Sequence, residues 1–263
     1  MTSNLAVNLS GDRAINDDLE IVAHATLKKF TKLFEGSPPA GERPIHIFYR
    51  PEEPITFSTS DVTVYSIGLT VCERRYNQLV FQLSHELCHV YADPRRSNWF
   101  VESCCEMMSQ VMLRRMSKTW ERLVPFRDRV TYAPKFEAYA KNRVREEALK
   151  TFQSECLPGQ EQLSKWFGNI KGTLVKEPRD YERNVIIAEM LRPLFENSAA
   201  NWDALRFLGQ ASASPPVDLK DLDVNSEFGF DRWLDIVPEH LTDLVRRISN
   251  IFEHETQTSS SQM

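Results

Sequence analysis

The hydrophobic pattern of the chain changes its period twice, from helical spacing to period two after about residue 34 and back to helical spacing near residue 76, and these changes restrict the folds that the chain can adopt. Before that point, three segments rich in β-branched and aromatic residues alternate with period two, which is typical of short strands. They are IHIFYR (45–50), ITFSTS (55–60) and VTVYSIGLTV (62–71). After residue 76, apolar residues recur at helical spacing almost to the end. The pattern predicts an α+β protein with a small mixed sheet and a mainly helical C-terminal half.

The helical spacing also predicts where the individual helices lie. They are expected at residues 15–34, 76–92, 99–116, 133–155, 160–168, 178–196, 200–208 and 238–253. The Pro- and Ser-containing segment 211–230 reads as a long connector. The polar segment 254–263 reads as a disordered tail.

Composition excludes several classes of protein. With 263 residues, 41% of them hydrophobic and 26% charged, the chain can bury a sizeable core. Its net charge of -5 and scattered basic pairs give no reason to expect nucleic acid as a partner. No apolar run reaches the roughly 18 residues of a membrane span, and the N-terminus does not resemble a signal peptide. Five cysteines, an odd number, suggest reduced thiols. We therefore expect a cytoplasmic protein with no membrane partner.

The sequence HELCH (85–89) is the strongest candidate for a chemical site. Residues four apart on a helix differ by about 40° of rotation and 6 Å of rise, so His85 and His89 can direct their imidazoles at one metal ion. Glu86 lies about 100° round the helix, within reach of a water molecule at the same ion. This arrangement suits a hydrolytic metal centre.

A hydrolytic zinc site needs a third protein ligand, and Glu102 is the best candidate. The Asp93-Pro94 step can turn the chain, and Ser97 or Asn98 can cap a new helix that brings Glu102 back toward the histidines. Two further residues of that helix are of interest. Glu106 lies one turn later and could accept a hydrogen bond from a ligating histidine, whereas Cys105 is the rival third ligand. For Glu102 and Glu106, the alternative is an ordinary solvated position opposite the apolar side of their helix.

These residues resemble those of a known family. HELCH resembles the zinc-binding helix of the zincin metallopeptidases, and WFVESCCE (99–106) is similar to the second helix of the gluzincin branch. In the zinc aminopeptidases of that branch the corresponding run is Trp-Leu-Asn-Glu-Gly, with its glutamate as third ligand. Here Glu102 follows His89 by 13 positions. This gap is shorter than is usual in thermolysin-like enzymes and suggests a compact variant.

The resemblance implies a fold, a cofactor and an activity. Residues 1–120 would form the zincin-like catalytic core, and residues 121–253 a helical subdomain that makes the other wall of the cleft. The cofactor would be Zn²⁺, bound by His85, His89 and Glu102, with Glu86 as general base in the hydrolysis of a peptide or protein substrate. A downstream Tyr181 or His240 would steady the developing oxyanion. The segment 62–71 would be the edge strand to which the peptide adds.

Two other functions use the same residues. One is a metallopeptidase-like scaffold that binds or regulates a partner without turnover, and the other is a zinc hydrolase that acts on a non-peptide amide. Retention of Glu86 favours an enzyme over the scaffold, since a scaffold has no need of a base. Peptide deformylases also combine HExxH with an upstream cysteine, as Cys72 is here, but their other motifs are absent. Cys88, inside HELCH, is expected to be a buried apolar side chain.

Overall fold

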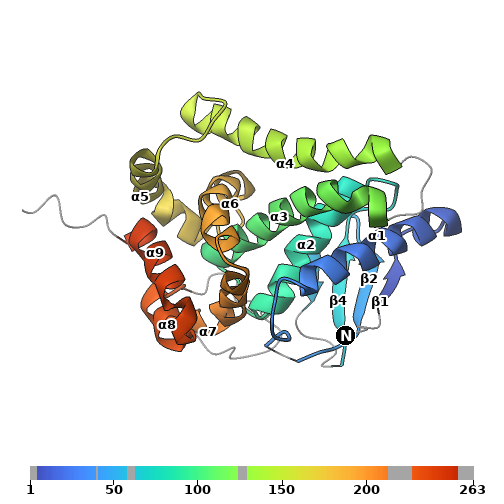
Figure 1. Ribbon diagram of the computed structural model, residues 1–263, viewed down its shortest axis with the longest axis horizontal. Helices are drawn as coiled ribbons and strands as arrows, with labels where there is room; N and C mark the ends of the chain where they lie inside the picture. The colour runs from blue at the N-terminus through green and yellow to red at the C-terminus, as the bar shows by residue number, and fades with distance from the viewer. Residues whose placement is uncertain (1–4, 40, 58–62, 124–128, 213–226, 254–263) are drawn as a thin grey trace, which may run out of the picture.

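The computed structural model describes residues 5–39, 41–57, 63–123, 129–212 and 227–253 (Figure 1). The strands are β1 (Leu5–Asn8), β2 (Ile45–Tyr49), β3 (Ile55–Phe57) and β4 (Tyr65–Leu69). The α-helices are α1 (Arg13–Thr31), α2 (Tyr76–Ala92), α3 (Trp99–Leu123), α4 (Arg129–Phe152), α5 (Gln160–Lys176), α6 (Tyr181–Glu196), α7 (Leu208–Ala211), α8 (Phe230–Ile236) and α9 (Thr242–Glu253). Short 3-10 helices are η1 (Ala199–Phe207) and η2 (Glu239–Leu241). The α+β class and the helical C-terminal half are confirmed.

The four strands form one mixed sheet in the order β1-β2-β4-β3. The first three are parallel, and β3 runs antiparallel to β4. The side chains of Ile47 and Ile67, which pair across β2 and β4, are fully buried on the face that α1 and α2 cover. The prediction that segment 62–71 is the edge strand is wrong, because β4 has a partner on each side. The edge strand beside α2 is β3.

The first strand was not predicted, because a four-residue strand carries almost no periodic signal. Asn16, in the first turn of α1, binds the end of β1. Its Oδ1 accepts from the backbone N–H of Leu9 at 2.8 Å, and its Nδ2 donates to the carbonyl of Val7 at 3.1 Å. Asp12 caps α1 by accepting from the backbone N–H of Ile15. These side-chain contacts couple the start of the sheet to its crossover helix.

Helix α3 runs through the centre of the molecule, between α2, α4 and α6 (Figure 1). Every residue from Trp99 to Leu113 is buried, so the helix has no solvated face along this stretch. The alternative that Glu102 and Glu106 are surface carboxylates is therefore wrong. Their exposed fractions are 2% and 1%. Buried carboxylates require partners, and those partners define the site described below.

The connection between α2 and α3 is held from the far end of the chain. Asp93 has a φ of 79°, and a Cβ atom on Gly209 of α7 would lie only 2.4 Å from Asp93 Cβ. Arg96 Nη1 donates to the carbonyls of Gly209 and Ser212, each at 2.8 Å. Asn98 caps α3 as predicted, with its Oδ1 accepting from two backbone N–H groups at 3.1 Å. Segment 208–212 thus fixes the turn that leads into α3.

The C-terminal helices pack on the same core as the sheet. One hydrophobic cluster extends from Leu9, beside β1, to Phe252 in α9. Helix α8 was not predicted: it begins inside the segment expected to be a connector. The rest of that connector and the tail at 254–263 lie outside the described residues. The division into 1–120 and 121–253 stays a prediction. Within the described ranges, none of the helices combines the length and the hydropathy that a membrane span requires.

Candidate metal centre

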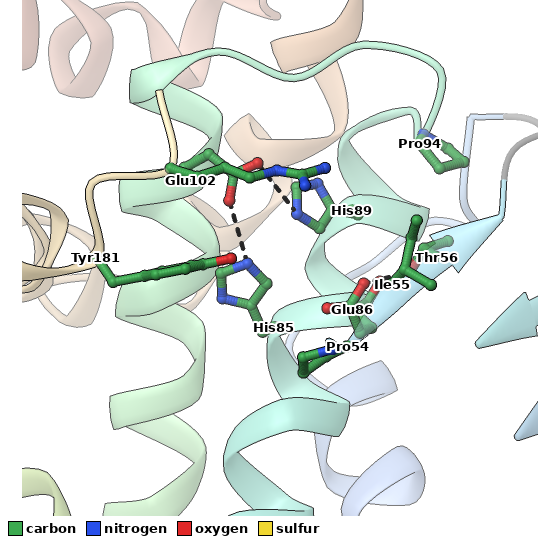
Figure 2. A pocket seen from close by; sticks show the side chains of 10 residues that line it. Pro54, Ile55, Thr56, His85, Glu86, His89, Pro94, Glu102 and Tyr181 are labelled. Carbon is green, nitrogen blue, oxygen red and sulfur yellow. Dashed lines mark hydrogen bonds and ion pairs between the residues drawn. The ribbon is translucent and has the colours of Figure 1, made fainter. Parts of the chain in front are cut away.

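Two helices bring the predicted ligands together. His85 and His89 lie on the same side of α2 with ring centroids 5.1 Å apart, and both face Glu102 in the first turn of α3 (Figure 2). His85 Nε2 is 3.2 Å from Glu102 Oε2, and His89 Nε2 is 3.6 Å from Glu102 Oε1. The side chains of these residues are 2–13% exposed. A buried cluster of two imidazoles and one carboxylate therefore forms as predicted.

Electrostatics tie the three side chains to one another. Burial alone would lower the pKa of His89, but the negative charge of Glu102 and its hydrogen bond raise it to about 9. Burial would likewise raise the pKa of Glu102, yet the histidines hold it well below its usual value. Glu102 is thus an acceptor only, so the Nε2–H of His85 donates to it. The atoms that make these bonds are those that would bind a metal.

The spacing of these atoms suits a metal ion. With zinc bonds of about 2.0–2.1 Å, two ligand atoms of a tetrahedral shell are roughly 3.3 Å apart. The distances of 3.2 and 3.6 Å between the histidine nitrogens and the Glu102 oxygens are close to this value. Imidazole nitrogen and carboxylate oxygen are also among the ligands that zinc uses. Each histidine nitrogen therefore lies at a suitable distance from one oxygen of Glu102, and the two distances join different oxygen atoms.

Cys105 remains a rival third ligand. His85, His89 and Cys105 each offer one ligand atom, these atoms lie within 4.8 Å of one another, and the group could hold a metal ion. Burial, together with a hydrogen bond to Cys88, raises the pKa of the Cys105 thiol well above its usual value. The thiol thus keeps its proton unless a metal displaces it. Cys88 itself is fully buried, as expected for an apolar role.

The predicted general base has a partner that the sequence did not reveal. The hydroxyl of Thr56, on the edge strand β3, is 2.8 Å from Glu86 Oε2 and 3.0 Å from the carbonyl of Glu86. Both residues are buried, and both line the same pocket as the histidines (Figure 2). Thr56 therefore fixes the rotamer of the Glu86 carboxylate. No local pattern links two residues 30 positions apart.

Of the two predicted oxyanion-stabilising residues, one lies at the site. Tyr181 begins α6, its ring centroid is 6.4 Å from that of His85, and Figure 2 shows its hydroxyl directed toward the histidines. Burial of the hydroxyl, followed by the charge of Glu102, raises the pKa of Tyr181 to about 12, so it remains a hydrogen-bond donor at neutral pH. The residue as a whole is 46% exposed. His240 is exposed on η2 and does not line the pocket.

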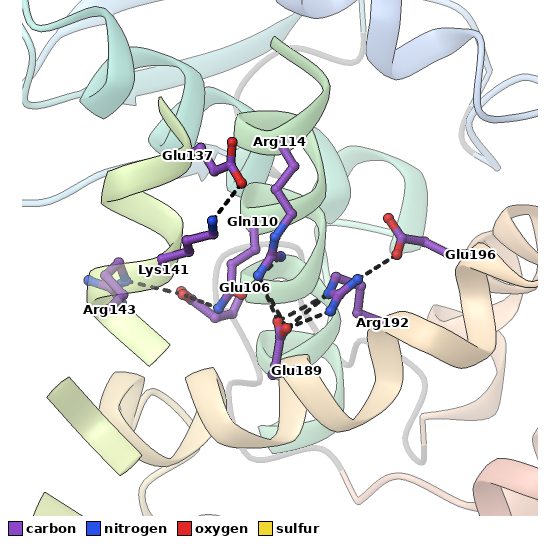
Figure 3. Close-up of polar contacts among 9 residues, drawn as sticks. All are labelled: Glu106, Gln110, Arg114, Glu137, Lys141, Arg143, Glu189, Arg192 and Glu196. Carbon is purple, nitrogen blue, oxygen red and sulfur yellow. Dashed lines mark hydrogen bonds and ion pairs between the residues drawn. The ribbon is translucent and has the colours of Figure 1, made fainter. Parts of the chain in front are cut away.

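Glu106 does not have the predicted partner. Instead of a histidine, its Oε1 accepts from Arg143 Nε at 3.3 Å and from Gln110 Nε2 at 3.4 Å (Figure 3). Glu106 lies one turn beyond Glu102, where the cation within reach is Arg143 of α4. Its role is structural and belongs to the packing of α3 on α4.

The site residues surround a small pocket of about 30 Å³. A water molecule needs about 10–15 Å³ by this measure, so the space holds one or two molecules of that size. Apart from the residues already named, the lining includes Pro54, Ile55, Pro94 and Arg179. The sequence pattern pointed to none of these four as site residues, because each reaches the pocket through the tertiary fold.

Comparison with known proteins adds no assignment. None of the protein-family models, curated proteins or solved structures with which the chain was compared matches it.

Proposed function

We propose that this protein is a zinc-dependent metallopeptidase of the gluzincin type that acts in the cytoplasm. The observation that carries the proposal is the contact of Glu102 with the Nε2 atoms of both His85 and His89 inside a buried pocket that also contains Glu86. Two histidines, a carboxylate and a separate glutamate as base are one set that hydrolytic zinc sites use. The five cysteines are free, in keeping with a reducing compartment.

His85, His89 and Glu102 would hold the ion. When bound, zinc supplies a Lewis acid that acidifies water and polarises a carbonyl. Glu86, oriented by Thr56, accepts the proton of the attacking water and later delivers it to the leaving amine. Tyr181 donates its hydroxyl proton in a hydrogen bond to the oxyanion that develops on the substrate.

A peptide is the substrate class that the surroundings of the site favour. Strand β3 is at the edge of the sheet, and its residues Ile55 and Thr56 line the pocket. An edge strand offers backbone N–H and carbonyl groups to which an extended chain adds as a further strand. Such main-chain pairing would lay a peptide bond across the site.

The first experiment measures zinc and turnover on the same samples. Zinc content is determined by mass spectrometry for the wild type, Glu102→Ala, Glu86→Gln and Cys105→Ser, and each sample is assayed for cleavage of a peptide mixture. We expect one zinc per chain in the wild type, loss of zinc in Glu102→Ala, and retained zinc without cleavage in Glu86→Gln.

Cys105→Ser separates the two candidate ligands. Zinc retained in Cys105→Ser but lost in Glu102→Ala supports the carboxylate as third ligand, whereas the opposite pattern would assign the thiol. A protein that takes up zinc yet cleaves no peptide would favour a binding scaffold or a hydrolase of non-peptide amides. A protein that takes up no zinc in any variant, after the metal has been offered, would refute the proposal.

A further inference from the structure

An ion pair bridges the two walls of the pocket at its rim. One wall is the edge strand with Pro54, Ile55 and Thr56, and the other is the start of α6 with Arg179 and Tyr181. Glu53, next to Pro54, places its Oε1 3.8 Å from Arg179 Nη1. The pair therefore joins a loop that precedes β3 to the turn that precedes α6.

Any substrate must separate these walls. Pockets that bind small organic ligands measure roughly 300–1,000 Å³, far more than the 30 Å³ of this pocket. The side chains of Arg179 and Glu53 are 37% and 48% exposed, and exposed ion pairs contribute little to stability. The contact is also long for an ion pair. The pair is thus easily broken when a substrate arrives.

Glu53 and Arg179 differ in whether another charged partner remains beside them once their ion pair is broken. Glu53 has a second cation beside it: Arg50 Nη1 donates to the Glu53 carbonyl at 2.9 Å and lies 3.9 Å from Glu53 Oε1. Among the described residues, the only carboxylate that forms an ion pair with Arg179 is that of Glu53. Of the acidic residues next to it, Asp180 pairs with Arg183 and Glu182 with Lys150. Arg179 would therefore face the opened pocket with an unpaired charge.

We propose that Arg179 is a specificity-determining residue that binds a carboxylate of the substrate, which takes the place of Glu53. The inference rests on the proposed function, since it places a substrate across the pocket of His85 and Glu86. A guanidinium presents a planar fork of N–H donors that matches a carboxylate in two parallel hydrogen bonds. The substrate is thus an acidic peptide, with its carboxylate on a Glu or Asp side chain or at its C-terminus.

The test compares matched peptides on matched variants. The mixture contains each peptide with Glu or Gln near the cleaved bond, and each with a free or an amidated C-terminus. We expect the wild type to prefer the carboxylate member of a pair by about tenfold or more in kcat/KM, the value of one charged hydrogen bond. A preference within the Glu/Gln pair would assign the carboxylate to a side chain, and a preference for the free C-terminus would assign it to the end of the peptide.

Variants of the rim pair should act in opposite directions. Arg179→Gln should reduce the preference to about one, while its zinc content stays that of the wild type. Glu53→Gln removes the competing carboxylate, so it should lower KM for acidic peptides severalfold. A preference that survives in Arg179→Gln, or a wild type that cleaves both members equally, would overturn the inference and leave the peptidase proposal standing.

Binding provides a measurement that does not depend on turnover. Fluorescence anisotropy follows the same labelled peptides on Glu86→Gln protein, with and without Arg179→Gln. If the wild type cleaves nothing, the proposed activity fails. Preferential binding of carboxylate peptides that requires Arg179 would still support the inference, and equal binding of both members would refute it.

Discussion

At the scale of single residues, the negative charge of Glu102 favours a positive charge at His89, either a proton or a metal cation. The pKa of His89 is raised from its ordinary value of 6.5 to about 9 because Glu102 offsets the cost of burial. In the metal-free protein this shift stabilises the fold fully below pH 6.5, and the contribution is lost as the pH rises through 9. A metal ion must displace the same proton, so proton and metal compete for one nitrogen.

The competition predicts how zinc affinity depends on pH. Between about pH 6.5 and 9 the apparent zinc affinity should rise by up to tenfold per pH unit, and it should level off above pH 9. Glu102 contributes no slope in this range, because its pKa is well below the usual value. Titration against a chelator of known pH dependence measures the affinity.

Glu102→Gln is the control for this titration. It keeps the shape of the side chain but removes the charge that raises the pKa of His89, so the affinity should be weaker and should level off at a lower pH. A wild-type affinity that does not change between pH 7 and 9 would contradict protonation of His89 in the metal-free protein.

The residues of the candidate metal centre differ in how far the sequence could predict them. His85, Glu86 and His89 follow from one spacing on one helix, and Glu102 follows from a short connection. Thr56 and Arg179 reach the pocket from positions distant in the chain, and neither carries a local signal. The partner of Glu106 was not predictable from helical spacing, because Arg143 reaches it from α4, a separate helix.

At the scale of elements, the α2–α3 connection determines whether Glu102 meets the histidines. Helix periodicity predicted both helices, and the polar residues between them predicted the turn and its Asn98 cap. The packing of α7 beneath this turn was not predictable, because it depends on a contact between residues more than 100 positions apart. The same holds for strand order: local alternation identifies a strand, but crossover connections decide which strand is at the edge.

Gly209→Ala tests the role of this packing. A Cβ atom there would lie 2.4 Å from Asp93 Cβ and 2.5 Å from the carbonyl oxygen of Ala92, so the backbone of the turn must move. We expect a loss of about 1–3 kcal/mol in the free energy of unfolding, as for other overpacked sites. Zinc affinity should fall as well, since Glu102 moves with the turn. Urea denaturation and chelator titration measure the two effects.

Gly172→Ala is the matched control. Gly172 lies within α5, where an added Cβ atom meets nothing within 4 Å. Alanine should stabilise this helix by up to about 1 kcal/mol, with no effect on zinc. If Gly209→Ala behaves like Gly172→Ala, the turn does not depend on its contact with α7.

At the scale of the whole molecule, buried charges link the helical layers. Glu106 on α3 is 1% exposed and accepts from Arg143 on α4 (Figure 3). The guanidinium of Arg143 also lies 4.7 Å from the ring centroid of Phe81 on α2. Burial would lower the pKa of Arg143, but the charge and hydrogen bond of Glu106, together with Tyr139 and Glu147, raise it. The side chain of Arg143 thus joins α4 to both α3 and α2.

Loss of Arg143 should be costly. Arg143→Met leaves the Glu106 carboxylate buried without a cation, so the free energy of unfolding should fall by about 3–5 kcal/mol. The double variant Arg143→Met with Glu106→Leu removes both charges and should recover much of the loss. Urea denaturation with an analysis of the double-mutant cycle measures the coupling.

Lys141→Met provides the comparison on the same helix. Lys141 pairs with Glu137 at 2.8 Å, but the two side chains are 68% and 49% exposed, so its loss should change the free energy of unfolding by less than about 1 kcal/mol. Equal effects of Arg143→Met and Lys141→Met would show that burial of Glu106 does not make its pairing important.

The contact of segment 208–212 with the α2–α3 connection also has a consequence for the time at which a metal ion could be bound in a cell. A ribosome releases His85, His89 and Glu102 well before it releases Gly209 and Ser212, which hold the turn between the two helices. A nascent chain therefore carries all three proposed metal ligands before it can hold them in register. Uptake of the ion would then be one of the last events in the maturation of the protein, completed after segment 208–212 has been translated.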